Sequence, residues 1–434
     1  MRPELNALGS VRHDLLVIGG GILGACLAWD AALRGLKVAL VERGEFGGAT
    51  SANSLRIVHG GLRYLARGDL PRMRESVRER SAFLRIAPGL VVPLPVAIPT
   101  GSPGYPGRTS FGLALGLNDL LSARRNRHLP ATHHLPRGRL LASGELADLC
   151  PGLGPLTRGG GALWYDARLS RPEQLTRAFV RSATDHGALA ADYACAERFT
   201  SRGGRVLSVA IQDCHSGARL EVAAAEVVVA AGPWTHEVLA LATRAGPGPH
   251  PRPRYALGLN LVVGRRLAEA AIGIRSDRLP REDPVGGGRR FLFLAPQDDT
   301  TLLGTWYGVA DEVDPEVALE QGSRMLLEDV NRACPGLRLT PAEIVGRQWG
   351  RLPLEPGRDG RFRGLADRPL LYEPGELGVA NLQGAETVKY TTARAVAERV
   401  IDRVAARLPG RYGPSRSAEI PLSGAGLPTR EAVQ

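Results

Sequence analysis

Three glycines near the N-terminus follow an apolar, strand-like segment and have the spacing of a dinucleotide site. The segment runs from Asp14 to Ile18, and the glycines are Gly19, Gly21 and Gly24. Such glycines let the chain turn tightly, let backbone N–H groups approach a pyrophosphate, and let the next helix pack closely on the sheet. The helix N-terminus then attracts the phosphates. We predict a nucleotide site here, against the alternative of an ordinary glycine-rich turn.

An acidic residue, Glu42, ends the second strand of the same unit, which begins at Lys37. A carboxylate in this position accepts hydrogen bonds from ribose hydroxyls and repels a 2′-phosphate. The pattern therefore favours FAD or NAD over NADP.

The composition is that of a folded globule with an excess of arginine. The 434 residues are 44% hydrophobic and 23% charged, and this length favours two domains. Only Lys37 and Lys389 are lysines among the 55 basic residues that give the net charge of +11. The charge is typical of a solvated basic surface, and an anionic substrate or a membrane surface is the alternative. Nucleic-acid binding is not indicated.

Targeting and metal signals are absent from the sequence. It has no run of eighteen apolar residues and no secretory signal, so we expect a cytoplasmic protein. Its five scattered cysteines predict neither disulfides nor a zinc site, and its separated histidines predict no other metal site. The basic segment 124–139 reads as a surface loop. Because it follows the helix-like segment 111–121, peripheral contact with acidic lipid at the inner membrane face is the alternative.

The order of predicted elements indicates an α/β fold with a discontinuous Rossmann-like domain and an inserted antiparallel α+β domain. Residues 226–231 lack polar alternation, which is typical of a parallel strand buried on both faces, and we place it beside the first strand. The Rossmann-like domain is expected at 11–80, 150–242 and 346–410. The inserted domain is expected at 81–149 and 243–345. We expect residues 411–434 to form a poorly ordered tail.

Several motifs together resemble the FAD-dependent glycerol-3-phosphate dehydrogenases and oxidases, which belong to the D-amino-acid-oxidase-like flavoproteins. The matching segments, in the family's order, are GGGILGACLAWDAALRGLKVALVERGEFGGATS, VHGGLRYL, YDARL, AAGPW and KYTTARAVAE. The resemblance implies that the nucleotide is FAD. It makes the Rossmann-like domain the FAD-binding domain and the inserted one the substrate domain.

The resemblance also implies which residues contact the cofactor. Around the ADP half it places Gly19, Gly21, Gly24, Glu42 and Arg43. Along the pyrophosphate and flavin it places Thr50, Ser51, Asn53, Ser54 and Gly232, with Lys389 near both flavin and substrate.

For the substrate, the resemblance implies hydride transfer from a carbinol carbon to flavin N5, with arginines holding a phosphate. Arg63 and Tyr64 match positions that face this phosphate, and a guanidinium suits it bidentately. Arg368 fits a third phosphate-side arginine by its distance from Lys389.

Three departures from the family pattern gather around the substrate. Asn260 stands where the family has a histidine proposed as proton acceptor, and a carboxamide is a poor base. Trp306 and Tyr307 stand where the family has small and acidic residues. Arg351 is shifted by one position from the family's substrate arginine, and such a shift turns a strand side chain to the other face.

We therefore predict an FAD-dependent oxidase or dehydrogenase that oxidises a C–OH bond of a small anionic substrate, such as glycerol 3-phosphate or a related polyol or sugar phosphate. Arg63, Arg351 and Lys389 would bind the anion, and His59, Lys389 or Tyr307 would supply the base. One alternative is oxidation of an amine or amino acid, for which Asn260 is harmless. A further alternative is a non-catalytic flavin-binding protein. The electron acceptor stays open among oxygen, a quinone and a soluble carrier.

Overall fold

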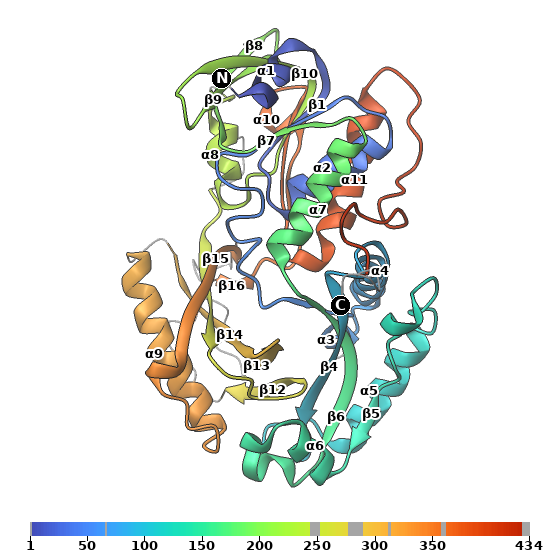
Figure 1. The fold of residues 1–434 in the computed structure, drawn as a ribbon, viewed down its shortest axis with the longest axis vertical. Helices are drawn as coiled ribbons and strands as arrows, with labels where there is room; N and C mark the ends of the chain where they lie inside the picture. Colours follow the sequence, from blue (N-terminus) through green and yellow to red (C-terminus); the bar gives the residue numbers. More distant parts are fainter. Residues whose placement is uncertain are drawn as a thin grey trace, which may run out of the picture. The chain divides into compact units, whose positions relative to one another are not determined.

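The computed structural model describes residues 2–65, 67–243, 252–276, 290–310, 314–356 and 362–427. The chain forms two compact units, each with its own sheet (Figure 1). Unit 1 comprises residues 1–52, 171–253 and 366–434, and unit 2 comprises 53–170 and 254–365.

Unit 1 is built on a largely parallel sheet with the strand order β17-β18-β10-β1-β2-β7. The strands are β1 (His13–Ile18), β2 (Val38–Val41), β7 (Leu189–Ala191), β10 (Arg219–Val229), β17 (Leu370–Tyr372) and β18 (Leu382–Glu386). β17 pairs antiparallel with β18, and the hairpin of β8 (Ala194–Arg202) and β9 (Arg205–Asp213) extends from β10. The predicted parallel pairing of the 226–231 strand with the first strand is confirmed, with Val228 opposite Val17.

Helices cover this sheet. They are α1 (Pro3–Ser10), α2 (Ile22–Leu33), α7 (Pro172–Asp185), α8 (Thr235–Ala240), α10 (Pro374–Leu377) and α11 (Ala393–Arg407), with short 3₁₀ turns at Gly232–Trp234 and Tyr390–Thr392. Helix α2 packs against β1, β2, α7 and α11 (Figure 1). Because it is covered on several sides, α2 is apolar nearly all round, and eleven of its twelve residues are buried.

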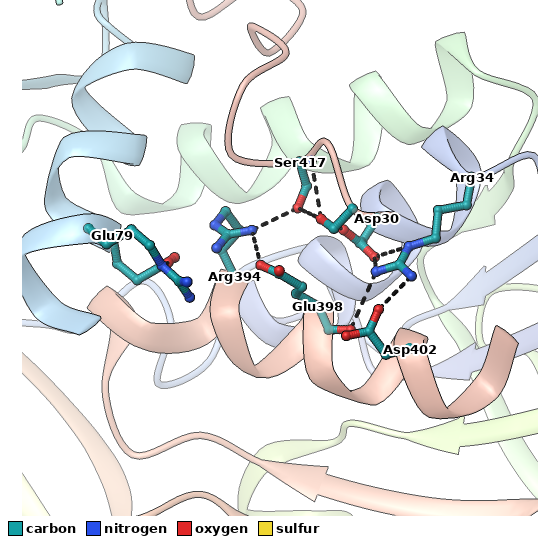
Figure 2. Close-up of polar contacts among 9 residues, drawn as sticks. Asp30, Arg34, Glu79, Arg394, Glu398, Asp402 and Ser417 are labelled. Atoms are coloured by element: carbon teal, nitrogen blue, oxygen red, sulfur yellow. Dashed lines mark hydrogen bonds and ion pairs between the residues drawn. The ribbon is translucent and has the colours of Figure 1, made fainter. Parts of the chain in front are cut away.

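The C-terminal segment is ordered through residue 427, so the expectation of a poorly ordered tail is wrong for 411–427. Figure 2 shows the polar cluster that holds this segment. Arg394 is 1% exposed, pairs with Glu398 at 2.9 Å, and donates to Ser417 Oγ at 3.0 Å. Ser415 donates to the fully buried Asp30 of α2. A buried charge needs polar partners, and the serines of the tail add to the ion pairs that Arg394 and Asp30 make with Glu398 and Arg34. Residues 428–434 lie outside the described part.

Unit 2 contains a larger sheet with the order β16-β15-β11-β14-β13-β12-β4-β6-β3, and β5 pairs with β6. The strands are β3 (Ile57–Val58), β4 (Val91–Pro99), β5 (Arg139–Leu141), β6 (Gly161–Leu169), β11 (Tyr255–Val263), β12 (Ala271–Ser276), β13 (Arg290–Gln297), β14 (Thr300–Val309), β15 (Ile344–Pro356) and β16 (Phe362–Leu365). The pairing is antiparallel as predicted, except that β12 runs parallel to β4.

Unit 2 also contains helices in the segments that connect its strands. They are α3 (Leu62–Leu65), α4 (Leu70–Ile86), α5 (Arg108–Leu121), α6 (Ser143–Leu149) and α9 (Pro315–Ala333), with 3₁₀ turns at Ala131–His133, Pro151–Thr157 and Pro341–Glu343. Helix α9 packs on β11, β12 and β14, where alternate strand residues form a core with its apolar side. None of the helices in the described ranges is long and apolar enough to cross a membrane.

The expected domain ranges differ from the two units at 53–80, 150–170 and 346–365, which belong to unit 2, and at 243–253, which belongs to unit 1. Strand pairing explains the three ranges in unit 2, because β3 pairs with β6 and β15 pairs with β11. Assigning the cofactor to unit 1 and the substrate to unit 2 remains a prediction.

Candidate active site

Several predicted cofactor residues follow the carboxyl ends of neighbouring parallel strands in unit 1. Gly19 follows β1, Glu42 follows β2, Gly232 follows β10 and Lys389 follows β18. These four strands are adjacent and parallel, so their carboxyl ends share one edge of the sheet. Open α/β sheets bind their ligands at this edge.

The glycine turn has no room for side chains at two positions. Gly19 has φ +109°, and a Cβ there would lie 2.5 Å from the carbonyl oxygen of Ala230. A Cβ on Gly24 would lie 1.7 Å from the carbonyl oxygen of Gly19. At Gly21, by contrast, a Cβ would meet only Ser51 Oγ, at 3.1 Å. Glycine is thus required for the close approach of α2 to β1, as the sequence predicts.

The loop at 50–54 meets the start of α2. Ser51 Oγ accepts a hydrogen bond from the N–H of Ile22 at 3.0 Å, and Ser54 Oγ accepts one from the N–H of Arg56 at 3.2 Å. Thr50 and Asn53 lie in the same loop and are half-buried. Ser51 therefore stands at the helix N-terminus, where a pyrophosphate is expected.

Glu42 is held by two backbone amides. Its Oε2 accepts from the N–H of Gly20 at 2.7 Å, and its Oε1 accepts from the N–H of Gly44 at 2.8 Å. A carboxylate has about four acceptor sites, so two stay available for ribose hydroxyls. Next to it, the guanidinium of Arg43 lies 4.2 Å from the ring centre of Trp234. The glycine turn, Ser51 and Glu42, which we call the nucleotide cradle, fit the ADP half of FAD.

Gly232 and Lys389 lie farther along the same edge. Gly232 has φ +55°, and apart from its two neighbours in the chain no described residue lies within 4 Å of the position its Cβ would take. Lys389 is half-buried, and its carbonyl oxygen accepts from Thr387 Oγ1 at 3.1 Å. Arg368 is exposed and precedes β17, whose residue Leu370 pairs with Glu386. This pairing brings Arg368 to the end of β18 where Lys389 follows.

In unit 2 the predicted His59, Arg63 and Tyr64 form one cluster. The rings of His59 and Tyr64 lie 5.9 Å apart, edge to face. The exposed Arg63 donates to the hydroxyl of the buried Tyr64 at 3.2 Å. Tyr64 thus orients the guanidinium rather than presenting its own ring to solvent.

A buried ion pair that the sequence analysis missed supports this loop. Asp166 Oδ1 accepts from the N–H of Gly60 at 2.6 Å and pairs with Arg80 at 2.7 Å. Its Oδ2 accepts from Trp164 Nε1 at 3.0 Å. The available signal was a carboxylate within the largely apolar strand that contains the YDARL motif.

Asn260 lies on the face of the β11–β14–β15 sheet opposite to α9, which we call the Asn260 face. It is 3% exposed, and its Oδ1 accepts from Thr305 Oγ1 at 2.8 Å. Tyr307 is opposite Gly258 on this face. The guanidinium of Arg290, a residue not predicted, lies 5.9 Å from the Tyr307 ring centre.

The expectation for Trp306 is wrong. A bulge between Leu259 and Asn260 brings Trp306 opposite the core residue Leu259. Its ring packs on α9, where a Cβ on Gly322 would lie 2.6 Å from it. Trp306 is therefore part of the core rather than of the Asn260 face.

The strand register also separates Arg351 from Asn260. Arg351 is opposite Leu257, a core residue on the α9 side, whereas Gln348 is opposite Asn260 and Leu352 is opposite Ala256. Opposed residues point to the same side of a sheet. Arg351 therefore points away from the Asn260 face, and Gln348 and Leu352 point toward it. The predicted binding of the substrate anion by Arg351 does not fit this register.

The chain is similar over nearly its whole length to proteins named glycerol-3-phosphate dehydrogenase. It is 32% identical to the one from Synechocystis, over 98% of this chain and 75% of that protein. It is 31% identical to one from Mycobacterium leprae, over 96% of this chain and 67% of that protein.

Solved structures share the fold. The Bacillus halodurans glycerol-3-phosphate dehydrogenase complexed with FAD superposes with a TM-score of 0.72 at 24% identity, over 97% of this chain and 70% of that one. Glycine oxidase from Bacillus cereus has a TM-score of 0.58 at 18% identity, over 92% and 96% of the two chains.

A family model described as FAD dependent oxidoreductase matches residues 14–403. This match confirms the predicted cofactor and class of enzyme. The chain belongs to the FAD-dependent oxidoreductase family.

Proposed function

We propose that this protein oxidises a C–OH carbon of a small phosphorylated polyol, with glycerol 3-phosphate as the first candidate. The observation that carries the proposal is the exposed Arg63 guanidinium, oriented by Tyr64 on a loop fixed by the buried Asp166. A planar guanidinium suits a phosphate bidentately. Relatives named glycerol-3-phosphate dehydrogenase, at 31–32% identity, support this substrate.

Different residues of the chain would bind the cofactor and the substrate. Bound FAD supplies the hydride acceptor. The nucleotide cradle holds its ADP half, while Arg63 binds the substrate phosphate and Lys389 and Arg368 add positive charge. Asn260 orients a substrate hydroxyl through its carboxamide. We assign Arg351 no contact with the substrate, because the strand register places it opposite the core residue Leu257.

The hydroxyl proton needs an acceptor other than Asn260. His59, Lys389 and Tyr307 are the candidates, and we favour His59. An imidazole is the side chain that ordinarily exchanges a proton near neutral pH, whereas ammonium and phenol groups do so near pH 10. His59 also lies on the same loop as Arg63, against Tyr64.

Oxidation of an amine or amino acid is the second candidate function. The carboxamide of Asn260 favours it, because a neutral amine needs no strong base. The arginine would then hold a carboxylate. A non-catalytic flavin protein is the third interpretation, and the nucleotide cradle alone would satisfy it.

Anaerobic bleaching of the flavin distinguishes these three candidate functions. Glycerol 3-phosphate, sugar phosphates, hydroxy acids and amino acids are added in turn to the holoenzyme. Rapid bleaching by a polyol phosphate supports the proposal, and bleaching by amino acids alone replaces it with the second candidate. If none of these compounds bleaches the flavin, the result supports the third candidate, a non-catalytic flavin-binding protein. Reoxidation of the reduced protein by oxygen, a quinone or a soluble carrier then identifies the electron acceptor.

A further inference from the structure

A strongly basic pocket lies in unit 2 between α4 and the segment that follows α5. Its volume is about 360 Å³, and no carboxylate is among its lining residues. Six arginines and His128 line it. The arginines are Arg74, Arg78, Arg85, Arg124, Arg125 and Arg127. None of these residues belongs to the candidate active site.

Three of the pocket's arginines carry uncompensated charge. Arg78 pairs with Glu79 at 3.2 Å, and Arg125 pairs with Asp119 at 3.0 Å. Within the described ranges, the exposed Arg74, Arg124 and Arg127 have no carboxylate partner. The pocket therefore has a surplus of positive charge and guanidinium donors free to bind a ligand.

The buried Arg125 fixes one wall of the pocket. It is 9% exposed, donates from Nε to the carbonyl of Leu135 at 3.1 Å, and donates to the carbonyl of Pro136 at 3.1 Å. Burial lowers the pKa of Arg125, and the nearby cations Arg80 and Arg137 lower it further against the attraction of Asp119. The segment after α5 is thus held in place within a positive field.

We propose that this pocket binds a phosphate-bearing anion at a site separate from the substrate site. Several guanidinium groups around one concave surface suit the oxygens of a phosphate. Such a group has two sources, a soluble phosphate compound or the headgroup of an acidic lipid. Leu113 and Leu120 of the adjoining α5 are 73% and 72% exposed, and Leu117 is 44% exposed. Their spacing puts them on one side of α5, where only the lipid source would use them.

The test compares two double variants of the holoenzyme. Arg124→Gln/Arg127→Gln removes two arginines of the pocket that lack a carboxylate partner. Arg12→Gln/Arg202→Gln removes the same charge from two exposed arginines of unit 1 and serves as the control. Pyrophosphate binding is measured by calorimetry. Vesicle binding is measured by sedimentation with phosphatidylcholine, with and without phosphatidylglycerol.

We expect the pocket variant to lose about tenfold or more in affinity for one of the two probes, and the control to stay within about twofold of the unchanged protein. Loss for pyrophosphate identifies the soluble source. Loss for acidic vesicles, reproduced by Leu113→Gln/Leu120→Gln, identifies the lipid headgroup. The proposal is overturned if the unchanged protein binds neither probe, or if the pocket variant and the control bind both equally. Flavin content and thermal unfolding check that each variant folds, and neither outcome depends on the substrate of the enzyme.

Discussion

The nucleotide cradle of unit 1 and the Asn260 face of unit 2 both use strands to position functional groups, but by different means. In the cradle, the absence of side chains at Gly19 and Gly24 allows α2 to approach β1, and backbone amides hold the carboxylate of Glu42. On the Asn260 face, function depends on which side chains the register of three strands brings to one side. The geometry of the nucleotide cradle is thus determined by the local sequence, whereas the composition of the Asn260 face is determined by the pairing of strands that are distant in the sequence.

This difference makes the two regions respond differently to mutation. A single added methyl group at Gly19 or Gly24 would collide with backbone atoms that cannot move away. A change on the Asn260 face would alter ligand contacts while leaving the strands paired. Cofactor binding should therefore fail together with folding, whereas substrate preference should vary independently of it.

Gly24→Ala tests the cradle with the largest expected effect. The new Cβ would lie 1.7 Å from the Gly19 carbonyl oxygen, so α2 must shift away from β1. We expect a loss of about 1–3 kcal/mol in the free energy of unfolding and weak retention of flavin. Thermal unfolding and the ratio of flavin to protein absorbance measure both.

The matched control is Gly116→Ala in α5. Among the described residues, nothing beyond the adjacent residues and the backbone of α5 itself lies within 4 Å of the new Cβ, so the helix should gain about 0.5–1 kcal/mol. Equal effects of the two substitutions would show that the close approach of α2 to β1 is unimportant.

Glu42→Gln removes the charge of the cradle without changing its shape. The amide can accept only at one oxygen, so one of the bonds from Gly20 and Gly44 is lost, together with the charge-assisted bonds expected from ribose. We expect FAD affinity to fall by about 1.5–3 kcal/mol, measured by titrating the flavin-free protein.

Glu45→Gln is the control for charge. Glu45 pairs with Arg177 at 2.8 Å, and both side chains are more than half exposed. Such a pair contributes little, so FAD affinity should change by less than about 1 kcal/mol. A similar loss in both variants would mean that net charge, rather than the position of Glu42, sets the affinity.

The same contrast explains which features the sequence predicts. The functions of Gly19, Gly24 and Glu42 arise within one βαβ unit, so their spacing alone indicates the site. Asp166 and Arg80 are far apart in sequence, and only the fold brings them to the loop at Gly60.

Register is the second obstacle to prediction from sequence. Trp306 was expected at the substrate, but the bulge at Leu259 and Asn260 turns it into the core. The side to which Arg351 points follows from strand alternation, which is a local rule, but that side does not fit the predicted binding of the substrate anion by Arg351. The ordered tail was missed because its partner Asp30 lies on a helix distant in the sequence, and because nothing local indicates that Arg394 is buried against Ser417.

Gln348→Met tests the Asn260 face. Gln348 Oε1 is buried and has no hydrogen-bond partner within the described part of the chain, so a donor on the ligand should satisfy it. Removing this acceptor should lower kcat/KM for the bleaching substrate by about 1 kcal/mol, or about fivefold, with flavin content unchanged.

Gln297→Met is the matched control. Both amide atoms of Gln297 are likewise buried without a described partner, but the residue lies at the end of β13, away from Asn260. Its replacement should raise the unfolding temperature and leave kcat/KM unchanged. If Gln348→Met behaves in the same way, Gln348 contacts no substrate.

Arg351→Gln should have the smallest effect, because the register places Arg351 opposite the core residue Leu257. We expect kcat/KM to stay within about twofold, whereas Arg63→Gln, measured alongside, should lose about tenfold or more through its contact with the substrate anion. A large loss at Arg351 would mean that the substrate reaches the α9 side of the sheet. The Asn260 face would then not be the binding surface, and strand alternation would fail as a guide to this half of the site.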